Sequence, residues 1–245
     1  MRYIDTVLIA ANTARTNAYA QAMANSNISV KAAILFDDRT DKPGKIDKTP
    51  KSTWSDSSVF VPDLSIPVKE SLSHVCEQLI EVSSNDVNSI DVLDAFKECY
   101  PRLAIYSGYG SQIVGKELLD ACPNIIHLHA GWLPDYRGST TIYYQLLNEG
   151  RCGVSAILLK ESIDTGPILS RKFYPKPPAE VDIDYLYDGA IRADLLVNVL
   201  GHCIKYGKLP SIENQNLEDG IDYYIIHPTL KHISILSINS GMKLK

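Results

Sequence analysis

The sequence predicts an α/β protein with a doubly wound, mostly parallel sheet and helices on its faces. Short apolar runs that suit buried strands alternate along the chain with segments of helical periodicity. The 245 residues have an apolar content of 45%, which is enough to bury a large core. In such sheets ligands bind outside the carboxyl ends of the strands, so we expect functional residues directly after predicted strands.

The N-terminal half supplies the first strands and helices in alternation. Its predicted strands are apolar runs, at residues 5–11, 29–36 and 103–107. Its predicted helices have amphipathic spacing, at residues 14–24, 72–82 and 90–99. Asn12 and Thr13 are suited to cap the first helix. The stretch 37–67 is polar and rich in Lys, Asp, Ser and Pro, and is therefore predicted to be a long surface loop.

The C-terminal half continues the alternation. Two further strands are predicted, at residues 124–129 and 153–159. Three further helices are predicted, at residues 116–121, 141–148 and 182–206. Gly207 and Pro210 are typical of the end of the last helix, and residues 223–235 suit one more strand–turn unit.

Composition excludes several classes of protein. A formal net charge of −5 gives no broad basic surface, so nucleic acid is not expected as a partner. The N-terminus has no signal-peptide pattern and no run of eighteen apolar residues occurs, so no membrane partner is expected. Five scattered cysteines without a C-x-x-C pair suit reduced thiols. We therefore expect a soluble cytoplasmic protein.

Two histidines share one face of a predicted strand. His127 and His129 alternate within NIIHLH, so their side chains point the same way, roughly 6–7 Å apart. The loop 161–167 (ESIDTGP) leaves another predicted strand and carries Asp164 close to a glycine that permits a tight backbone path. The loop 130–139 (AGWLPDYRGS) combines Gly, Pro and aromatic residues as binding loops do. These features predict one pocket containing two imidazoles and a carboxylate.

Three ordered motifs resemble the formyl-tetrahydrofolate-dependent formyltransferases: HLHAGWLPDYRG at 127–138, GVS at 153–155 and IDTGPI at 163–168. That family has an Asn-x-His pair before a Leu-Pro-x-Tyr/Phe-Arg/Lys-Gly loop, and an Asp in a downstream Asp-x-Gly turn. The ordered match runs from about residue 103 to residue 168. The resemblance implies a formyltransferase-like catalytic domain, a Rossmann variant, over residues 1–210. Residues 211–245 would form an extension that packs on this domain or serves a homodimer.

The resemblance also implies site residues. His129 falls on the catalytic His of the family and Asp164 on its catalytic Asp, and His127 is expected to act with them. The formyl donor, formyl-tetrahydrofolate, is expected to contact Tyr106, Ser107, Gly108, Tyr109, Gly110, Ile113, Glu161 and Asp164. The amine acceptor is expected to contact Tyr136, Arg137, Gly138 and Ser139, although Tyr136 and Arg137 are equally suited to a scaffolding role. No metal is expected.

Departures from the family pattern reduce the range of amine acceptors that we expect. His127 replaces the catalytic Asn, and Ile157 stands where many members have a His. The first strand is followed by NTART, at 12–16, instead of the glycine-rich turn that holds phosphate in the purine-synthesis member, so glycinamide ribonucleotide is not expected. About forty residues follow the 182–206 helix, in place of the barrel domain of initiator-tRNA enzymes. We therefore expect a small amine, such as an amino sugar on a nucleotide carrier.

Two other functions match parts of this pattern. His-x-His on a strand with a distant Asp is also a ligand set for zinc or iron(II), so a metal-dependent enzyme using His127, His129 and Asp164 is an alternative. That alternative leaves the resemblance of the two loops unexplained. A non-catalytic relative that binds folate or a nucleotide also agrees with the missing Asn. Metal analysis and a turnover assay distinguish the three functions.

Overall fold

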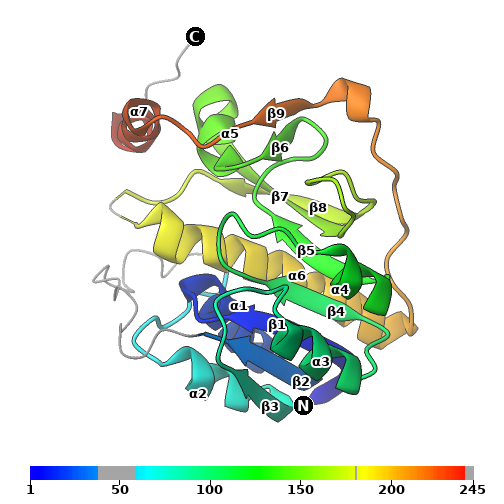
Figure 1. Ribbon diagram of the computed structural model, residues 1–245. Coiled ribbons are helices and arrows are strands. Elements are labelled where there is room, and N and C mark those ends of the chain that lie inside the picture. The colour runs from blue at the N-terminus through cyan, green and yellow to red at the C-terminus, as the bar shows by residue number, and fades with distance from the viewer. Residues whose placement is uncertain (38–58, 180, 241–245) are drawn as a thin grey trace.

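The computed structural model describes residues 1–37, 59–179 and 181–240. Its centre is a seven-stranded sheet of order β3-β2-β1-β4-β5-β7-β8 (Figure 1). The strands are β1 (Arg2–Ala11), β2 (Ile28–Phe36), β3 (Cys76–Val82), β4 (Ala104–Ser107), β5 (Ile125–His129), β7 (Arg151–Leu158) and β8 (Ile168–Pro175). The pairs from β3 to β5 are parallel, whereas β5–β7 and β7–β8 are antiparallel. This sheet confirms the predicted α/β class with mostly parallel strands.

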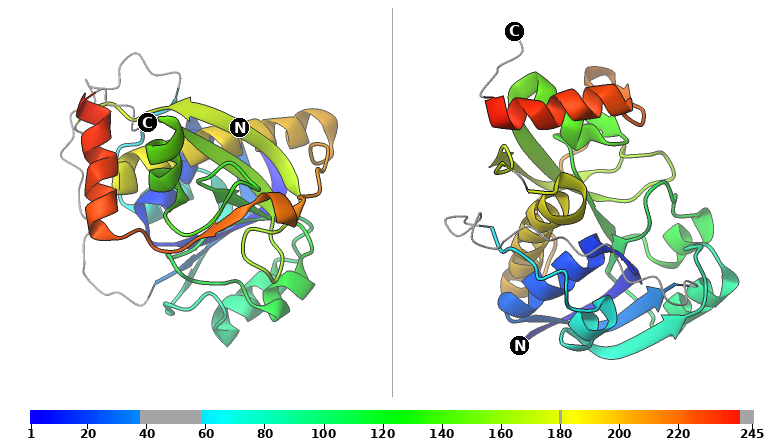
Figure 2. Two further views of the ribbon diagram at one scale, coloured as in Figure 1. Left: turned by 90° about the horizontal axis from the view of Figure 1, so that it is seen from above. Right: turned by 90° about the vertical axis from the view of Figure 1, so that its left-hand side faces the viewer.

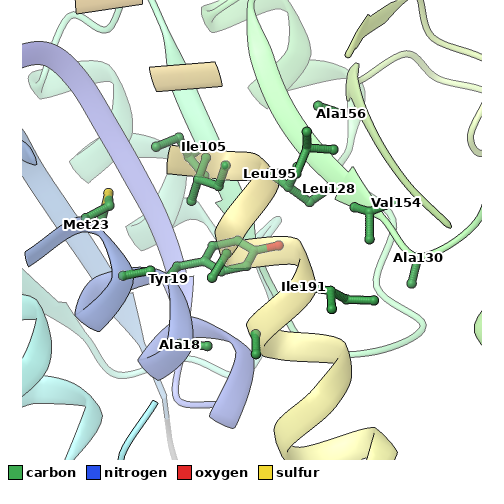
Figure 3. Close-up of a cluster of buried hydrophobic side chains, with 14 of the residues drawn as sticks. Ala18, Tyr19, Met23, Ile105, Leu128, Ala130, Val154, Ala156, Ile191 and Leu195 are labelled. Carbon is green, nitrogen blue, oxygen red and sulfur yellow. The ribbon is translucent and has the colours of Figure 1, made fainter. Parts of the chain in front are cut away.

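Helices cover both faces of the sheet (Figure 2). One face carries α1 (Ala14–Asn25), α2 (Val68–Ser73) and α6 (Asp188–Tyr206), which follows a π-helical turn at Ile183–Tyr187. The other face carries α3 (Ile90–Glu98) and α4 (Lys116–Ala121). Figure 3 shows side chains of α1 and α6, among them Tyr19, Ile191 and Leu195, gathered over the strands. Both faces therefore bury apolar cores, as a doubly wound sheet requires.

A second, smaller group of elements lies beyond β7 and β8. It contains β6 (Tyr136–Gly138), α5 (Thr141–Glu149), a 3-10 turn (Leu217–Asp219), β9 (Ile221–Tyr223) and α7 (Pro228–Ser240). β6 pairs in parallel with β9, so the loop after β5 is joined to the C-terminal segment (Figure 1). No helix among the described residues is both long and apolar enough to span a bilayer.

Two of the predicted elements are wrong. The helix predicted over 72–82 is instead the end of α2 followed by the edge strand β3. Glu77 and Glu81 lie four residues apart and imitate helical spacing. Both are exposed on β3, which pairs with β2 at the edge of the described sheet. The strand–turn unit predicted over 223–235 consists of the end of β9 and most of α7. Most of the loop predicted over 37–67 lies outside the described residues.

The strand order reverses between β1 and β4. β2 and β3 lie on one side of β1, and the chain then returns to place β4 and β5 on the other side. Thr13 caps α1 by accepting a hydrogen bond from the backbone N–H of Thr16, at 3.2 Å. The Thr16 hydroxyl lies 2.9 Å from the Ser107 hydroxyl and ties the start of α1 to the end of β4. Ligand sites of open α/β sheets lie at such reversal points, which directs attention to the carboxyl ends of β4 and β5.

Candidate active site

The three predicted polar side chains meet at the carboxyl end of β5. His127 and His129 come from β5, and Asp164 comes from the loop between β7 and β8. One ring nitrogen of each histidine and one carboxylate oxygen of Asp164 lie within 4.8 Å of one another. Nδ1 of His129 is 3.2 Å from Oδ2 of Asp164. Strand alternation and the downstream loop thus bring two imidazoles and a carboxylate together.

His129 is held on both sides of its ring. The residue is 4% exposed, and its Nε2 lies 2.7 Å from the carbonyl oxygen of Tyr136. The Thr141 hydroxyl, which donates to the Ala130 carbonyl, is 3.3 Å from the same nitrogen. Both ring nitrogens therefore face acceptor oxygens. These contacts fix the orientation of the imidazole ring between the Tyr136 carbonyl and the Asp164 carboxylate.

Asp164 is a buried carboxylate on an unusual backbone. Its φ is +54°, in the left-handed region, and Gln215 fixes this turn by donating to the Asp164 carbonyl at 2.8 Å. The N–H of Gly138 donates to Oδ2 at 2.9 Å. Burial by itself raises the pKa of Asp164, but the charge and hydrogen bond of His129, the charge of His127 and the Gly138 N–H outweigh it and hold the pKa well below its usual range. The carboxylate is therefore ionised at neutral pH.

The loop after β5 is shaped by two small residues. A side chain at Gly131 would begin 2.6 Å from Nε2 of His129 and 2.7 Å from the Tyr136 carbonyl oxygen, so only glycine leaves the contact between them open. The buried Ser155 hydroxyl donates to the Gly131 carbonyl at 2.7 Å and accepts from the Leu133 N–H at 3.0 Å. Ser155, from the GVS motif, thereby holds the loop that faces His129.

His127 has fewer polar partners than His129. Its ring centroid is 5.9 Å from that of Tyr106, and its Nδ1 is buried without a hydrogen-bond partner among the described residues. Burial lowers the pKa of His127 to about 3; Asp164 opposes this shift, and the guanidiniums of Arg192 and Arg15 add to it. The imidazole is therefore neutral over the ordinary range of pH.

Two arginines near His127 were missed by the sequence analysis. Arg15, at the start of α1, donates to the Gly108 carbonyl, and its Nε is buried without a partner among the described residues. Arg192 of α6 donates to the Leu128 carbonyl and pairs with Asp188 at 2.9 Å. Among the described residues Arg15 forms no ion pair with a carboxylate, and the charge of Asp188 only partly opposes the lowering of its pKa by burial. Arg15 directly follows the first predicted strand, and this position could have identified it as a site residue. Arg192 lies within a long helix among other polar residues, and nothing in the sequence distinguishes it.

The predicted donor-binding residues extend from the core to the surface. Tyr106, Ser107 and Gly108 are buried at the end of β4, and burial raises the pKa of Tyr106 to about 12. The Tyr106 hydroxyl is buried without a hydrogen-bond partner among the described residues. The outer residues of the set are exposed, namely Gly110, Ile113 and Glu161. Tyr109 lies between the two groups and donates from its hydroxyl to Asp37 at 2.9 Å.

Arg137, a predicted acceptor contact, binds the C-terminal segment through its guanidinium. It pairs with Asp222 at 2.8 Å and donates to the carbonyls of Leu217 at 2.9 Å and Gly220 at 3.3 Å. The residue is 8% exposed. Its side chain therefore joins β6 to the C-terminal segment, in agreement with the scaffolding alternative.

The other predicted acceptor contacts lie around the same strand. Tyr136 is buried, and its ring stacks on that of Tyr223 with centroids 5.4 Å apart. The backbone N–H of Ser139 donates to the Tyr223 carbonyl at 2.8 Å. Gly138 contacts Asp164 and Tyr136 contacts His129, in both cases through backbone atoms.

Comparison with known proteins identifies the family. The family described as Formyl transferase matches residues 5–188. The methionyl-tRNA formyltransferase of Pelobacter propionicus is 31% identical over 170 residues, which are 67% of this chain and 50% of that protein. The corresponding protein of Finegoldia magna is 32% identical over 139 residues, covering 55% and 44% of the two chains. The matches thus span about half the length of these curated relatives.

Solved structures share the fold at low sequence identity. A sugar N-formyltransferase from Shewanella sp FDAARGOS_354 aligns with a TM-score of 0.56 and 19% identity, covering 96% of this chain and 87% of that one. An N-formyltransferase from Helicobacter canadensis, in complex with folinic acid and dTDP-3-aminofucose, aligns with a TM-score of 0.56 and 15% identity, covering 96% and 81%. Because the family match covers far more than half of the sequence, this chain belongs to the formyl transferase family.

Proposed function

We propose that this protein transfers a formyl group from formyl-tetrahydrofolate to a primary amine of a small acceptor. Formyl-tetrahydrofolate is the donor typical of the family. The observation that carries the proposal is the buried, ionised Asp164 with its Oδ2 3.2 Å from Nδ1 of His129, at the carboxyl end of β5. A carboxylate and an imidazole in contact can accept, hold and return a proton, which transfer to an amine requires.

The residues beside His129 and Asp164 are suited to hold the flat pterin ring of the donor. A side chain at Gly110 would meet no atom within 4 Å, so its backbone is open to a ligand, and Ile113 is 55% exposed beside it. The buried Tyr106 hydroxyl has no partner among the described residues and is available for a polar group. We infer that residues 106–113 and the loop of Asp164 would hold the donor.

When bound, the donor supplies an electrophilic formyl carbon, and the protein supplies the charges around it. Negative charge develops on the formyl oxygen as the amine attacks, and hydrogen-bond donors fixed toward that oxygen lower the barrier. Because Nε2 of His129 faces the Tyr136 carbonyl, His129 would donate to the formyl oxygen from Nδ1, the nitrogen that also faces Asp164. Neutral His127 would supply a second N–H donor in place of the family amide. Asp164 would take up the amine proton, directly or through water, and help return it to the folate nitrogen as the bond between that nitrogen and the formyl carbon breaks.

The acceptor that we propose is an amine on an anionic carrier, such as an amino sugar nucleotide. Arg15 is a cation near His127 that has no carboxylate partner among the described residues. Desolvating an unpaired charge is costly, and a negatively charged acceptor would compensate it. The solved N-formyltransferase from Helicobacter canadensis is in complex with dTDP-3-aminofucose, an amino sugar on an anionic nucleotide carrier.

A direct transfer assay tests the proposed function. The purified chain is incubated with formyl-tetrahydrofolate and a panel of amino-sugar nucleotides, uncharged amino sugars and small amines, with chelator present. Formation of tetrahydrofolate and of the N-formyl product should require both substrates and should favour the anionic amines. Failure to turn over any amine, combined with failure to bind a reduced folate in calorimetry, would exclude a formyltransferase.

Replacing the carboxylate tests proton handling. Asp164→Asn keeps the size of the side chain but cannot accept the amine proton, so we expect kcat/KM to fall by at least roughly 10²-fold, the lower range for a general acid–base group. Circular dichroism and reduced-folate binding should show that the variant still folds. Near-normal kcat/KM in a folded Asp164→Asn variant would remove Asp164 from the proposed mechanism.

Substitutions at His127 test the donor role. His127→Asn restores an N–H donor and should retain substantial activity, whereas His127→Ala should lose roughly 10²–10³ in kcat, the usual cost of one such donor. Steady-state kinetics on both variants measure the difference. Similar, near-complete inactivation of both would indicate a role that needs the imidazole itself, and near-normal activity of both would make His127 structural.

The low pKa of His127 also predicts how the free energy of unfolding depends on pH. In the unfolded chain the imidazole has a pKa of about 6.5, whereas the folded pKa is about 3. Between these values the unfolded state binds a proton that the folded state excludes, so stability is lost as pH falls. We expect the wild type to lose more stability than His127→Asn between pH 7.5 and 5, measured by urea unfolding with chelator present. Both proteins contain the same charged neighbours of position 127, namely Asp164, His129, Arg15 and Arg192. If the free energies of unfolding of the two proteins fall in parallel with pH, His127 binds its proton equally well in the folded and unfolded states, and the prediction is wrong.

A further inference from the structure

We propose that His127, His129 and Asp164 also bind a divalent transition-metal ion, for which zinc is the probe, and that the bound ion inhibits formyl transfer. The ion would occupy the groups that the reaction needs, so this site differs from a metal-dependent active centre. The inhibition rests on the proposed function, whereas the binding does not.

The positions of the ligand atoms are close to those of a zinc site. One nitrogen from each imidazole and one oxygen from Asp164 lie within 4.8 Å of one another. Tetrahedral zinc with bonds of about 2.0–2.1 Å separates neighbouring ligand atoms by roughly 3.3 Å. The 3.2 Å between Nδ1 of His129 and Oδ2 of Asp164 already has that value. Any longer separation to His127 needs a shift on the order of 1 Å.

The groups behind two of the ligands are those of a metal site. A metal-binding histidine commonly donates its other N–H to a backbone carbonyl, which fixes the ring. Nε2 of His129 faces the Tyr136 carbonyl at 2.7 Å and leaves Nδ1 for the metal. The Gly138 N–H donates to Asp164 at 2.9 Å and orients the carboxylate. These ligands are therefore held in place before an ion arrives.

His127 completes the set because it is not tethered at its buried nitrogen. Its Nδ1 has no hydrogen-bond partner among the described residues, so a shift of the ring breaks no bond there. An asparagine at this position, as in the family pattern, would offer an amide, which is a poor ligand for zinc. Two imidazoles and one carboxylate, with a further coordination position open, form a set that zinc and iron(II) both accept.

The surrounding charges limit the affinity. Asp188 balances Arg192, but Arg15 has no carboxylate partner among the described residues, and a dication beside it is repelled. We therefore expect binding weaker than that of structural zinc fingers and readily reversed by chelator. Reversible occupancy is what an inhibitory site requires.

Calorimetry on the full chain tests the binding. Zinc chloride titrated into metal-free wild type should show one equivalent, and His127→Asn should bind at least about tenfold more weakly, since one ligand is lost. His127→Asn is the matched variant because it replaces the imidazole with the family amide. Cobalt(II) gives a second measurement, because a tetrahedral centre should produce visible absorption in the wild type alone. Equal zinc affinity in the two proteins, or no visible cobalt bands in the wild type, overturns the site.

Rates measured with and without zinc test the inhibition. Each protein is compared with itself in chelator, so the basal activity of His127→Asn does not enter the ratio. Zinc should inhibit the wild type at concentrations at least about tenfold below those that inhibit His127→Asn. Activation by zinc, or equal inhibition of both proteins, overturns the inhibitory role. Zinc binding without formyl transfer under any condition would contradict the proposed function and leave the metal site standing, whereas transfer without zinc binding would do the reverse.

Discussion

The contact between His129 and Asp164 depends on the backbone of β6. Within this short strand the Tyr136 carbonyl faces the His129 ring, and the Gly138 N–H donates to the Asp164 carboxylate. The strand thus presents a carbonyl acceptor to the His129 ring and an N–H donor to the Asp164 carboxylate. A small displacement of β6 would weaken both hydrogen bonds together, and Asp164 would lose part of what keeps it ionised while buried. Ser155 limits such a displacement by binding the loop that leads into β6.

β6 is in turn fixed by a part of the chain that lies beyond the family match. Its ladder partner is β9, and Arg137 spans from β6 to Asp222. Gln215 binds the Asp164 turn from the same C-terminal segment. Residues 211–240 therefore contact both loops that meet at His129 and Asp164, although the family match ends at residue 188. The segment thus helps to hold the candidate active site in place.

The sequence revealed those features that follow from local rules. The convergence of His127 and His129 follows from side-chain alternation, and Asp164 follows from a turn motif. The edge strand β3 was mistaken for a helix because its apolar and polar residues do not alternate strictly, and because the exposed Glu77 and Glu81 are spaced as on one face of a helix. Arg15 and Arg192 belong to helices far apart in the chain, and only the packing of α1 on α6 brings them to the same site. The main contributions of Tyr136 and Gly138 to the site are made by backbone atoms, which no side-chain pattern can indicate.

The exchange of Asn for His at position 127 is best understood together with position 157. The two residues face each other across the antiparallel pair of β5 and β7, so their side chains share one face of the sheet. The resemblance to the family places His127 where the family pattern has an Asn, and Ile157 where the pattern of many members has a His. This chain thus has an imidazole on the same face of the sheet, but on β5 and not on β7. Ile157 packs with Leu133 and Ile168 in a small apolar cluster, where a second imidazole would have to bury its polar atoms among apolar side chains. Ile157 therefore keeps this position of β7 apolar, and the imidazole at the facing position of β5, His127, is the group that both the proposed donor role and the proposed metal site require.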